Sequence, residues 1–290
     1  MAYTVTFWGT RGSIPTPGAH TARYGGNTPC VAVEGVGGRL LILDAGTGIR
    51  ALGNKLVERQ NGAVNAEILL SHAHWDHIQG LPYFKPFFSP GNVVRIWGSR
   101  QGSTSLEAIL RHQMDPAVFP VPLDALSARL TVQHVEPGEF TVGEFRVRAM
   151  KLRHPGTTLG YRLEPVGGGA TLAYVTDNEL GNGDGPDYGT PASWRKDFVR
   201  FLDGVDLLIH DAMYTPEELA SHRGWGHSTF EQAVAVAAEA GAQQLVLFHH
   251  EPEHGDEVVD RLLNEARRIA KKSGRPKEVL AAQEGMTLTL

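Results

Sequence analysis

The alternation of hydrophobic and polar residues predicts that the chain opens with β-strands. Residues Thr4–Trp8 alternate, whereas Leu40–Leu43 is an uninterrupted apolar run that ends at Asp44. Helical spacing follows at Ile49–Arg59, and a strand pattern returns at Ala66–Leu70. The pattern therefore predicts a sheet whose strands end beside polar residues.

Strand and helix patterns continue along the rest of the chain. Further strands are predicted at Cys30–Val33, Val93–Trp97, Leu130–His134, Phe145–Leu152, Leu159–Leu163, Leu172–Thr176, Leu207–His210 and Leu245–Phe248, and helices at Ser103–Arg111, Trp194–Leu202, Ser228–Ala240 and Glu257–Lys272. Ser228 and Glu231 have the spacing of a capping box, and the proline-rich segment Asp115–Pro122 predicts a lid-like loop. Because no linker interrupts the pattern, residues 1–290 are expected to form a single domain.

Composition narrows the class of protein. The chain is 41% hydrophobic and 20% charged with a net charge of −5, which is typical of a soluble globular protein and argues against a long nucleic-acid footprint. Cys30 is the only cysteine, which excludes an intramolecular disulfide, and no apolar run reaches the ~18 to 20 residues of a membrane span. Because Met1–Trp8 alternates rather than resembling a secretory leader, we expect a cytoplasmic protein without membrane contact.

The strongest chemical signal is a histidine cluster. His72, His74, Asp76 and His77 directly follow the apolar strand Ala66–Leu70. In an extended segment the first two histidines point the same way, while the last two residues can turn to a second position beside them. Imidazole and carboxylate together suit zinc, manganese or iron, whereas calcium and magnesium prefer oxygen ligands. A polar surface loop would explain one histidine, but four candidate ligands predict a centre for two divalent transition-metal ions, zinc first, with manganese or iron as alternatives.

The pattern His-x-His-x-Asp-His after a strand resembles the signature of the metallo-β-lactamase superfamily. Within it, the chain is most similar to ribonuclease Z and the related cyclic phosphodiesterases, such as the phosphoribosyl 1,2-cyclic phosphodiesterase of phosphonate breakdown. The similar segments are Phe7-Trp8-Gly9-Thr10, Ile209-His210-Asp211-Ala212, Gly226-His227-Ser228-Thr229 and Leu245–His249, and the resemblance runs from about Thr4 to Pro252. It implies an α+β fold, an αββα four-layer sandwich of two mixed sheets flanked by helices.

The resemblance also implies a set of ligands that are distant along the chain. His72, His74 and His154 would bind a first metal, Asp76, His77 and His249 would bind a second, and Asp177 would bridge the two. Asp44 would brace the metal loop, and His250 would lie on the other side of its strand. A hydroxide bridging the metals would be the nucleophile. Taken alone, His154 is as well explained as a surface histidine, and Asp177 as the cap of a turn.

Two residues outside the ligand set resemble the proton-donating pair of phosphodiesterases in this superfamily. Asp211, which stands where glutamate is usual, would orient the His227 imidazole and favour its protonated form, so that His227 protonates the leaving group. Together with Asp76, these are the predicted catalytic residues. For His227 alone, a residue that merely precedes a helix cap is an equal alternative.

The predicted substrate is a small phosphodiester, either a cyclic nucleotide or a cyclic sugar phosphate. Between Leu159 and Asp177 there is no room for the arm with which ribonuclease Z grips transfer RNA, so transfer RNA is not expected. Substrate contacts are predicted at Arg11, Asn27, His222 and Trp225, and the rings of Trp75, Tyr24, Phe119 and Trp225 either stack on a base or pack in the core. The resemblance further implies a homodimer.

Three other functions remain open from the sequence. A lactonase or thioesterase could use the same metal centre but would not need Asp211 and His227. A ribonuclease acting on single strands would need clustered basic charge, whereas here it is scattered. A metal-binding or nucleotide-binding sensor could keep the fold without catalysis, although the complete ligand set argues against it.

Overall fold

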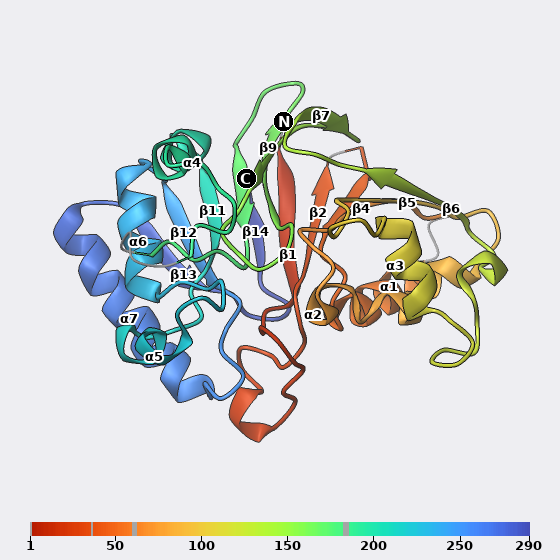
Figure 1. Ribbon diagram of the computed structural model, residues 1–290, viewed down its shortest axis with the longest axis horizontal. Coiled ribbons are helices and arrows are strands. Elements are labelled where there is room, and N and C mark those ends of the chain that lie inside the picture. The colour runs from red at the N-terminus through yellow and green to blue at the C-terminus, as the bar shows by residue number, and fades with distance from the viewer. Residues whose placement is uncertain (1, 36, 60–62, 182–185) are drawn as a thin grey trace.

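Two β-sheets form the centre of the molecule (Figure 1). The computed structural model describes residues 2–35, 37–59, 63–181 and 186–290. In spatial order, the first sheet has the seven strands β14 (Thr287–Thr289), β1 (Tyr3–Gly9), β2 (Cys30–Gly35), β3 (Leu40–Leu43), β4 (Asn65–Leu69), β5 (Val93–Gly98) and β6 (Arg129–His134). Strands β3 to β6 run parallel and the others pair antiparallel, so this sheet is mixed.

The second sheet is mixed in the same way. In spatial order its seven strands are β13 (Glu278–Ala281), β12 (Gln244–Phe248), β11 (Leu207–Asp211), β10 (Leu172–Val175), β9 (Leu159–Pro165), β8 (Phe145–Lys151) and β7 (Gly138–Val142). Strands β10 to β13 run parallel, and β7 to β10 pair antiparallel.

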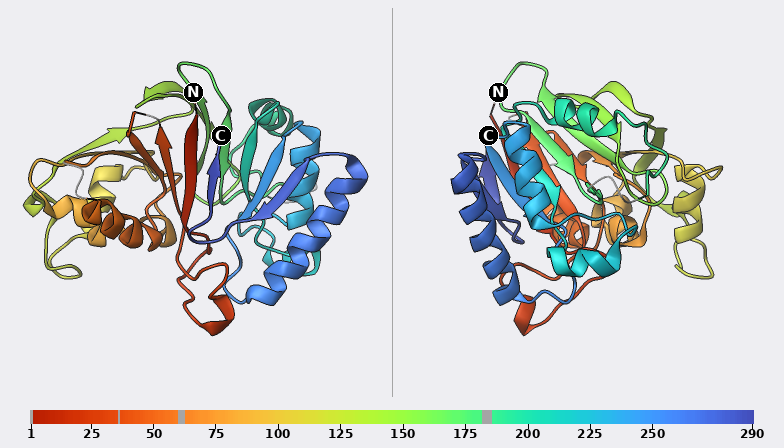
Figure 2. Two further views of the ribbon diagram at one scale, coloured as in Figure 1. Left: turned by 180° about the vertical axis from the view of Figure 1, so that it is seen from behind. Right: turned by 60° about the vertical axis from the view of Figure 1, so that its left-hand side comes forward.

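Helices cover the outer face of each sheet (Figures 1 and 2). The first sheet is covered by α1 (Gly48–Glu58), α2 (Trp75–Ile78) and α3 (Leu106–Gln113), and the second by α4 (Trp194–Leu202), α6 (Phe230–Glu239) and α7 (Asp256–Ser273), while α5 (Pro216–His222) has no buried residue. Short 3₁₀ helices lie at Ala19–Thr21, Leu81–Tyr83, Lys85–Phe88 and Leu123–Ala125. In the described part of the chain, no helix combines the length and apolar character that crossing a membrane requires. The predicted αββα sandwich is thus confirmed.

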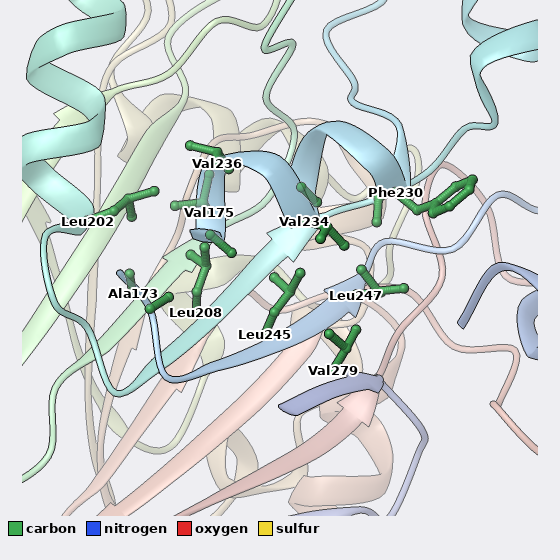
Figure 3. Close-up of a cluster of buried hydrophobic side chains, with 14 of the residues drawn as sticks. Ala173, Val175, Leu202, Leu208, Phe230, Val234, Val236, Leu245, Leu247 and Val279 are labelled. Atoms are coloured by element: carbon green, nitrogen blue, oxygen red, sulfur yellow. The ribbon is translucent and has the colours of Figure 1, made fainter. Parts of the chain in front are cut away.

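Apolar side chains fill the space between these layers. One cluster lies between the two sheets, and one lies between each sheet and its helices. Figure 3 shows Leu208 and Leu245, on neighbouring strands, directed towards Val234 on helix α6. All three side chains are fully buried, so their burial contributes to holding the helix against the sheet.

The parallel strands decide where polar side chains gather. Strands β3 and β4 are parallel neighbours in one sheet, and β10, β11 and β12 are parallel neighbours in the other. The residues of β3, β10, β11 and β12 are almost entirely buried, as expected for strands covered on both faces. Because parallel strands end at the same edge of a sheet, the polar residues that follow them come together there.

The start of helix α6 differs from the sequence prediction. The helix begins after Thr229, whose hydroxyl accepts a hydrogen bond from the Gln232 backbone while the Gln232 side chain accepts one from the Thr229 N–H. The predicted capping box of Ser228 and Glu231 is therefore wrong by one residue. The physical reason is tertiary, because the Ser228 hydroxyl donates to the Asn178 carbonyl instead.

Candidate metal centre

The predicted ligands come from strand ends that meet at one edge of the sandwich. His72 follows β4, Asp177 follows β10, His249 directly follows β12, and His154 lies in the connection between β8 and β9. Asp177 and His249 have positive φ angles of 47° and 61°. Non-glycine residues adopt this conformation at a cost and are enriched at functional sites, where the surrounding structure enforces it.

The first group of candidate ligands contains His72, His74, His154 and Asp177, whose ligand atoms all lie within 4.8 Å of one another. His74 Nδ1 is 3.0 Å from His154 Nε2. Asp177 Oδ2 is 3.6 Å from the Nε2 atoms of both His72 and His154. His74 is exposed whereas the other three are buried, so this group opens to solvent on the His74 side.

The second group contains Asp76, His77, Asp177 and His249, and all four are buried. His77 Nε2 is 3.2 Å from Asp76 Oδ2 and 3.1 Å from Asp177 Oδ1. His249 Nε2 is 3.2 Å from each of the same two oxygens. Asp177 thus directs Oδ2 towards the first group and Oδ1 towards the second, which is the arrangement that a carboxylate bridging two cations needs.

The spacing of these atoms fits metal coordination. Metal–ligand bonds of ~2.0 to 2.1 Å in a tetrahedron place neighbouring ligand atoms ~3.3 Å apart, and the distances in both groups are close to this value. The buried Nε2 atoms of His72 and His77 have no hydrogen-bond partner among the described residues. Their Nδ1 atoms are engaged, by the Ser71 hydroxyl at 3.0 Å and by Asp44 at 2.8 Å. Each ring is therefore oriented with a nitrogen left for a cation.

Electrostatics also suits a cation. Burial lowers the pKa of His72 and that of His154, the latter to about 4, so both imidazoles are neutral and keep a lone pair. Burial alone would raise the pKa of Asp177, but His249, His77 and His72 hold it well below its usual range. Asp177 is therefore a carboxylate at neutral pH. The donor set thus fits two divalent ions, and the roles of the individual ligands stay predictions.

Asp44 braces this cluster from behind. It is fully buried and directly follows β3. It accepts hydrogen bonds from the Ser71 backbone and hydroxyl at 2.7 and 2.8 Å, and from the Tyr174 hydroxyl at 2.8 Å, in addition to its contact with His77. Asp44 was predicted from the sequence, whereas Ser71 and Tyr174 were not. The position of Ser71 immediately before His72 is the one feature of the sequence that could have indicated that Ser71 supports the ligands.

Replacing Asp44 by asparagine is expected to lower metal affinity by ~10- to 100-fold, the usual effect of losing a group behind the ligands. The N–H₂ group of the new amide would face the hydrogen-bond donors of Ser71, His77 or Tyr174 and could not accept from them. The ring of His77 would therefore lose its fixed orientation. Chelator competition would measure the affinity. Asp206→Asn is the matched control, because Asp206 accepts backbone and hydroxyl hydrogen bonds from Thr171, away from the ligands. Wild-type affinity in the Asp44 variant would contradict the bracing role.

A histidine–aspartate pair lies against the ligands. His227 Nδ1 is 2.6 Å from Asp211 Oδ2, and its ring stacks on His249 with centroids 5.0 Å apart. Asp211 is fully buried, and its other oxygen accepts from the backbones of Met213 and Ser228. Burial alone would lower the pKa of His227, but Asp211 outweighs it and raises this pKa to about 9. The shorter aspartate thus reaches the imidazole, which carries a proton at neutral pH.

Two of the predicted substrate contacts are engaged elsewhere. Arg11 is fully buried, and its guanidinium donates to the carbonyls of Gly25, Glu251 and His254, so its substrate contact stays a prediction that these hydrogen bonds do not support. The Asn27 side chain donates to Glu284 at 2.9 Å. Both residues hold the N-terminal loop against the C-terminal part of the chain.

The other predicted contacts are spread around the centre. His222 is the last residue of α5, and Trp225 follows it on the segment that leads through His227 to α6; the Trp225 ring is exposed. Trp75 is exposed on α2, and Phe119 packs against Tyr83 with ring centroids 5.6 Å apart.

Two aromatic neighbours of the site are turned away from the ligands. Tyr24 is buried and donates to Asp260. His250 Nε2 donates to the Ala282 carbonyl at 2.9 Å, so it is His249 and not His250 that faces the ligands.

Comparison with known proteins agrees with this geometry. Residues 39–250, more than half of the chain, match the family described as the beta-lactamase superfamily domain. The chain is 26% identical to a ribonuclease Z of Halobacterium salinarum over 328 residues, which cover 99% of this chain and 97% of the relative.

Solved structures share the fold. The metallo-beta-lactamase fold protein YhfI from Bacillus subtilis has a TM-score of 0.70 at 21% identity over the full length of both chains. A diphosphatase from the PhnP family has a TM-score of 0.69 at 20% identity, covering 100% of this chain and 98% of that chain. These structures confirm the predicted fold, and the family match and the ribonuclease Z relative confirm the predicted enzyme class. The chain belongs to the beta-lactamase superfamily and is a metal-dependent hydrolase.

Proposed function

We propose that this protein is a phosphodiesterase with two metal ions that hydrolyses a small phosphodiester, a cyclic nucleotide or a cyclic sugar phosphate. The observation that carries the proposal is the position of the His227–Asp211 pair. These two residues form a third close group with Asp177 and His249, which also belong to the second ligand group. A protonated imidazole beside a metal pair suits a reaction in which an alkoxide leaves phosphorus, because that oxygen needs a proton.

The ligand groups support a centre with one cation on each side of Asp177. His72, His74 and His154 would hold the first ion and Asp76, His77 and His249 the second. Mixed imidazole and carboxylate donors favour zinc, with manganese or iron as alternatives. When bound, such ions supply Lewis-acid activation of the attacking water and of the phosphoryl group.

The chain's own residues supply orientation and the proton. His227 donates its proton to the departing oxygen, and Asp211 holds the imidazole in place through Nδ1. Asp76 is fixed by the backbone N–H of Ser13, which donates to its Oδ2 at 2.8 Å. The neighbouring Gly12 allows this approach, because a Cβ there would lie 2.5 Å from the His249 ring. The N-terminal loop therefore closes one side of the centre.

Transfer RNA is the second candidate substrate, because a relative that matches nearly the whole chain is a ribonuclease Z. Two observations favour a small substrate instead. Strands β9 and β10 are antiparallel neighbours joined through residues 166–171 alone, which leaves no protruding arm between them. The net charge of −5 also gives little general attraction for a polyanion.

A substrate panel tests the proposal. Protein stripped with a chelator and reloaded with zinc or manganese is expected to hydrolyse bis(p-nitrophenyl) phosphate and cyclic phosphates with higher kcat/KM than a lactone, a thioester or precursor transfer RNA. The stripped protein provides the inactive control. A lactone or thioester as the best substrate would contradict the proposal, and cleavage of precursor transfer RNA above all small diesters would favour the second candidate.

A further inference from the structure

We infer that Trp225 is a preordered stacking platform for a nucleobase of the substrate. The inference deepens the proposed phosphodiesterase function and rests on it, because it selects nucleoside phosphodiesters over sugar phosphates. Trp225 lies two positions before His227, the proposed proton donor, and 59% of its surface is exposed. An exposed tryptophan beside a reaction centre offers a planar apolar surface to a ligand.

A continuous row of rings connects Trp225 to the centre. The Trp225 ring meets His222 edge to face with centroids 4.7 Å apart, and His222 stacks on Tyr214 at 4.7 Å. Tyr214 is buried and meets the His227 ring edge to face at 5.9 Å. Trp225 is therefore backed by protein and lies at the outer end of a row that begins at the proton donor.

A buried carboxylate fixes the backbone on both sides of Trp225. Glu179 is only 3% exposed, and its Oε2 accepts hydrogen bonds from the N–H groups of Gly224 and Gly226, both at 3.0 Å. Oε2 also accepts the hydroxyl proton of Tyr188. Burying a carboxylate is costly unless its oxygens are hydrogen-bonded. The hydrogen bonds that Glu179 accepts offset this cost and hold the backbone on both sides of the exposed Trp225 ring.

Both residues beside Trp225 are glycines in a backbone conformation that favours glycine. Gly224 and Gly226 have φ angles of 84° and 88°, which other residues rarely adopt. A Cβ on Gly226 would also lie 2.0 Å from His154 Nδ1, and this nitrogen donates to the Gly226 carbonyl at 2.9 Å. The segment that carries Trp225 is thus tied directly to a candidate metal ligand, which fixes the distance between the platform and the centre.

These observations point to a ring rather than a sugar or alkyl group as the ligand. A preordered aromatic side chain binds a planar group without losing rotamer freedom. Stacking of a base on an aromatic residue tolerates any base, because every base has a π-face. Glu179 therefore acts as a positioning residue, and Trp225 determines specificity.

The test uses two substrates that differ only in the base, adenosine 2′,3′-cyclic phosphate and 1-O-methyl riboside 2,3-cyclic phosphate. Trp225→Ala is expected to raise KM for the adenosine compound roughly 5- to 100-fold, with kcat and the kinetics of the base-free compound unchanged. Tyr83→Ala is the matched control, because Tyr83 is 57% exposed but packs against Phe119. Equal changes in KM for both substrates, or no change in KM for either, would overturn the inference that Trp225 stacks on the base.

The Glu179 anchor is tested by the ratio of kcat/KM for the two substrates, which cancels any common loss of folded or metal-loaded protein. Glu179→Ala should lower this ratio, and Glu179→Gln should restore much of it, since the amide oxygen can still accept the glycine N–H bonds. In the Trp225→Ala background, Glu179→Ala should leave the ratio unchanged. If the effects of Glu179→Ala and Trp225→Ala on this ratio are fully additive, Glu179 does not act through Trp225, and its positioning role is wrong.

Failure of this inference is distinguishable from failure of the proposed function. If wild-type protein hydrolyses both cyclic phosphates with similar kcat/KM, it is a phosphodiesterase without a base platform. If it hydrolyses neither compound nor bis(p-nitrophenyl) phosphate, the phosphodiesterase function and the platform fail together.

Discussion

Replacing Asp177 by alanine is expected to abolish hydrolysis and to remove tightly bound metal from both sites at once. Its two oxygens face different ligand groups, and among the described residues Asp177 alone belongs to both the first and the second of these candidate groups. The loss should exceed the ~10- to 100-fold typical of residues behind the ligands. Metal content by elemental analysis and kcat/KM on bis(p-nitrophenyl) phosphate would measure it.

A second variant separates this effect from misfolding. Asp177 has a φ of 47°, where alanine is strained but asparagine is tolerated, so Asp177→Asn should keep the fold while losing the bridging charge. Its circular dichroism spectrum should match that of the wild type. Asp203→Ala, at an exposed residue after helix α4, is the control with unchanged metal content. An asparagine variant that holds two metals and hydrolyses normally would contradict the bridging role.

Replacing His227 by alanine is expected to lower kcat by about 10²- to 10⁴-fold for a diester with an alkoxide leaving group, without loss of metal. A diester with a p-nitrophenolate leaving group should be affected much less, because this group departs without a proton. Asp211→Asn should change the kcat for both substrates in the same directions as His227→Ala does. It keeps the imidazole but removes the charge that favours the protonated form of that imidazole.

The comparison of leaving groups is the decisive part of that experiment. Loss of rate that is equal for alkoxide and nitrophenolate would contradict proton donation by His227 and would indicate a role in binding or folding. His112→Ala provides the control, because His112 is an exposed histidine on helix α3. Its kinetics should equal those of the wild type with both substrates.

Much of the fold followed from local patterns. Buried parallel strands such as β3 and β12 are short apolar runs bounded by polar residues, so both their existence and the residues at their ends could be predicted. The cluster from His72 to His77 is local for the same reason. Distant members such as Asp177 and His249 came from resemblance, because nothing in their immediate neighbourhood distinguishes them from turn residues.

Two elements with little burial were missed. Strand β7 is a short edge strand of which only Val142 is buried, and helix α5 has no buried residue, so neither offers a long burial pattern. Helix α5 is instead held by a capping box between Thr215 and Glu218 and by the contact of Glu218 with His254. Its existence therefore depends on hydrogen bonds rather than on a hydrophobic pattern.

Contacts between distant segments were also beyond the sequence. Arg11 was predicted to contact the substrate, but its guanidinium donates hydrogen bonds to carbonyls up to 243 positions away. Glu179 reaches backbone N–H groups 45 and 47 positions ahead, and Tyr174 reaches Asp44 130 positions back. Such roles arise only once the strand ends have been brought together by the fold.

Elemental analysis of the purified wild-type protein tests the central claim most directly. The claim is that His72, His74, Asp76, His77, His154, Asp177 and His249 form one centre for two cations. The expected result is close to two transition-metal ions per chain that survive gel filtration and are removed by a strong chelator. Protein that retains no tightly bound transition metal, even after incubation with zinc, manganese or iron, would contradict the account.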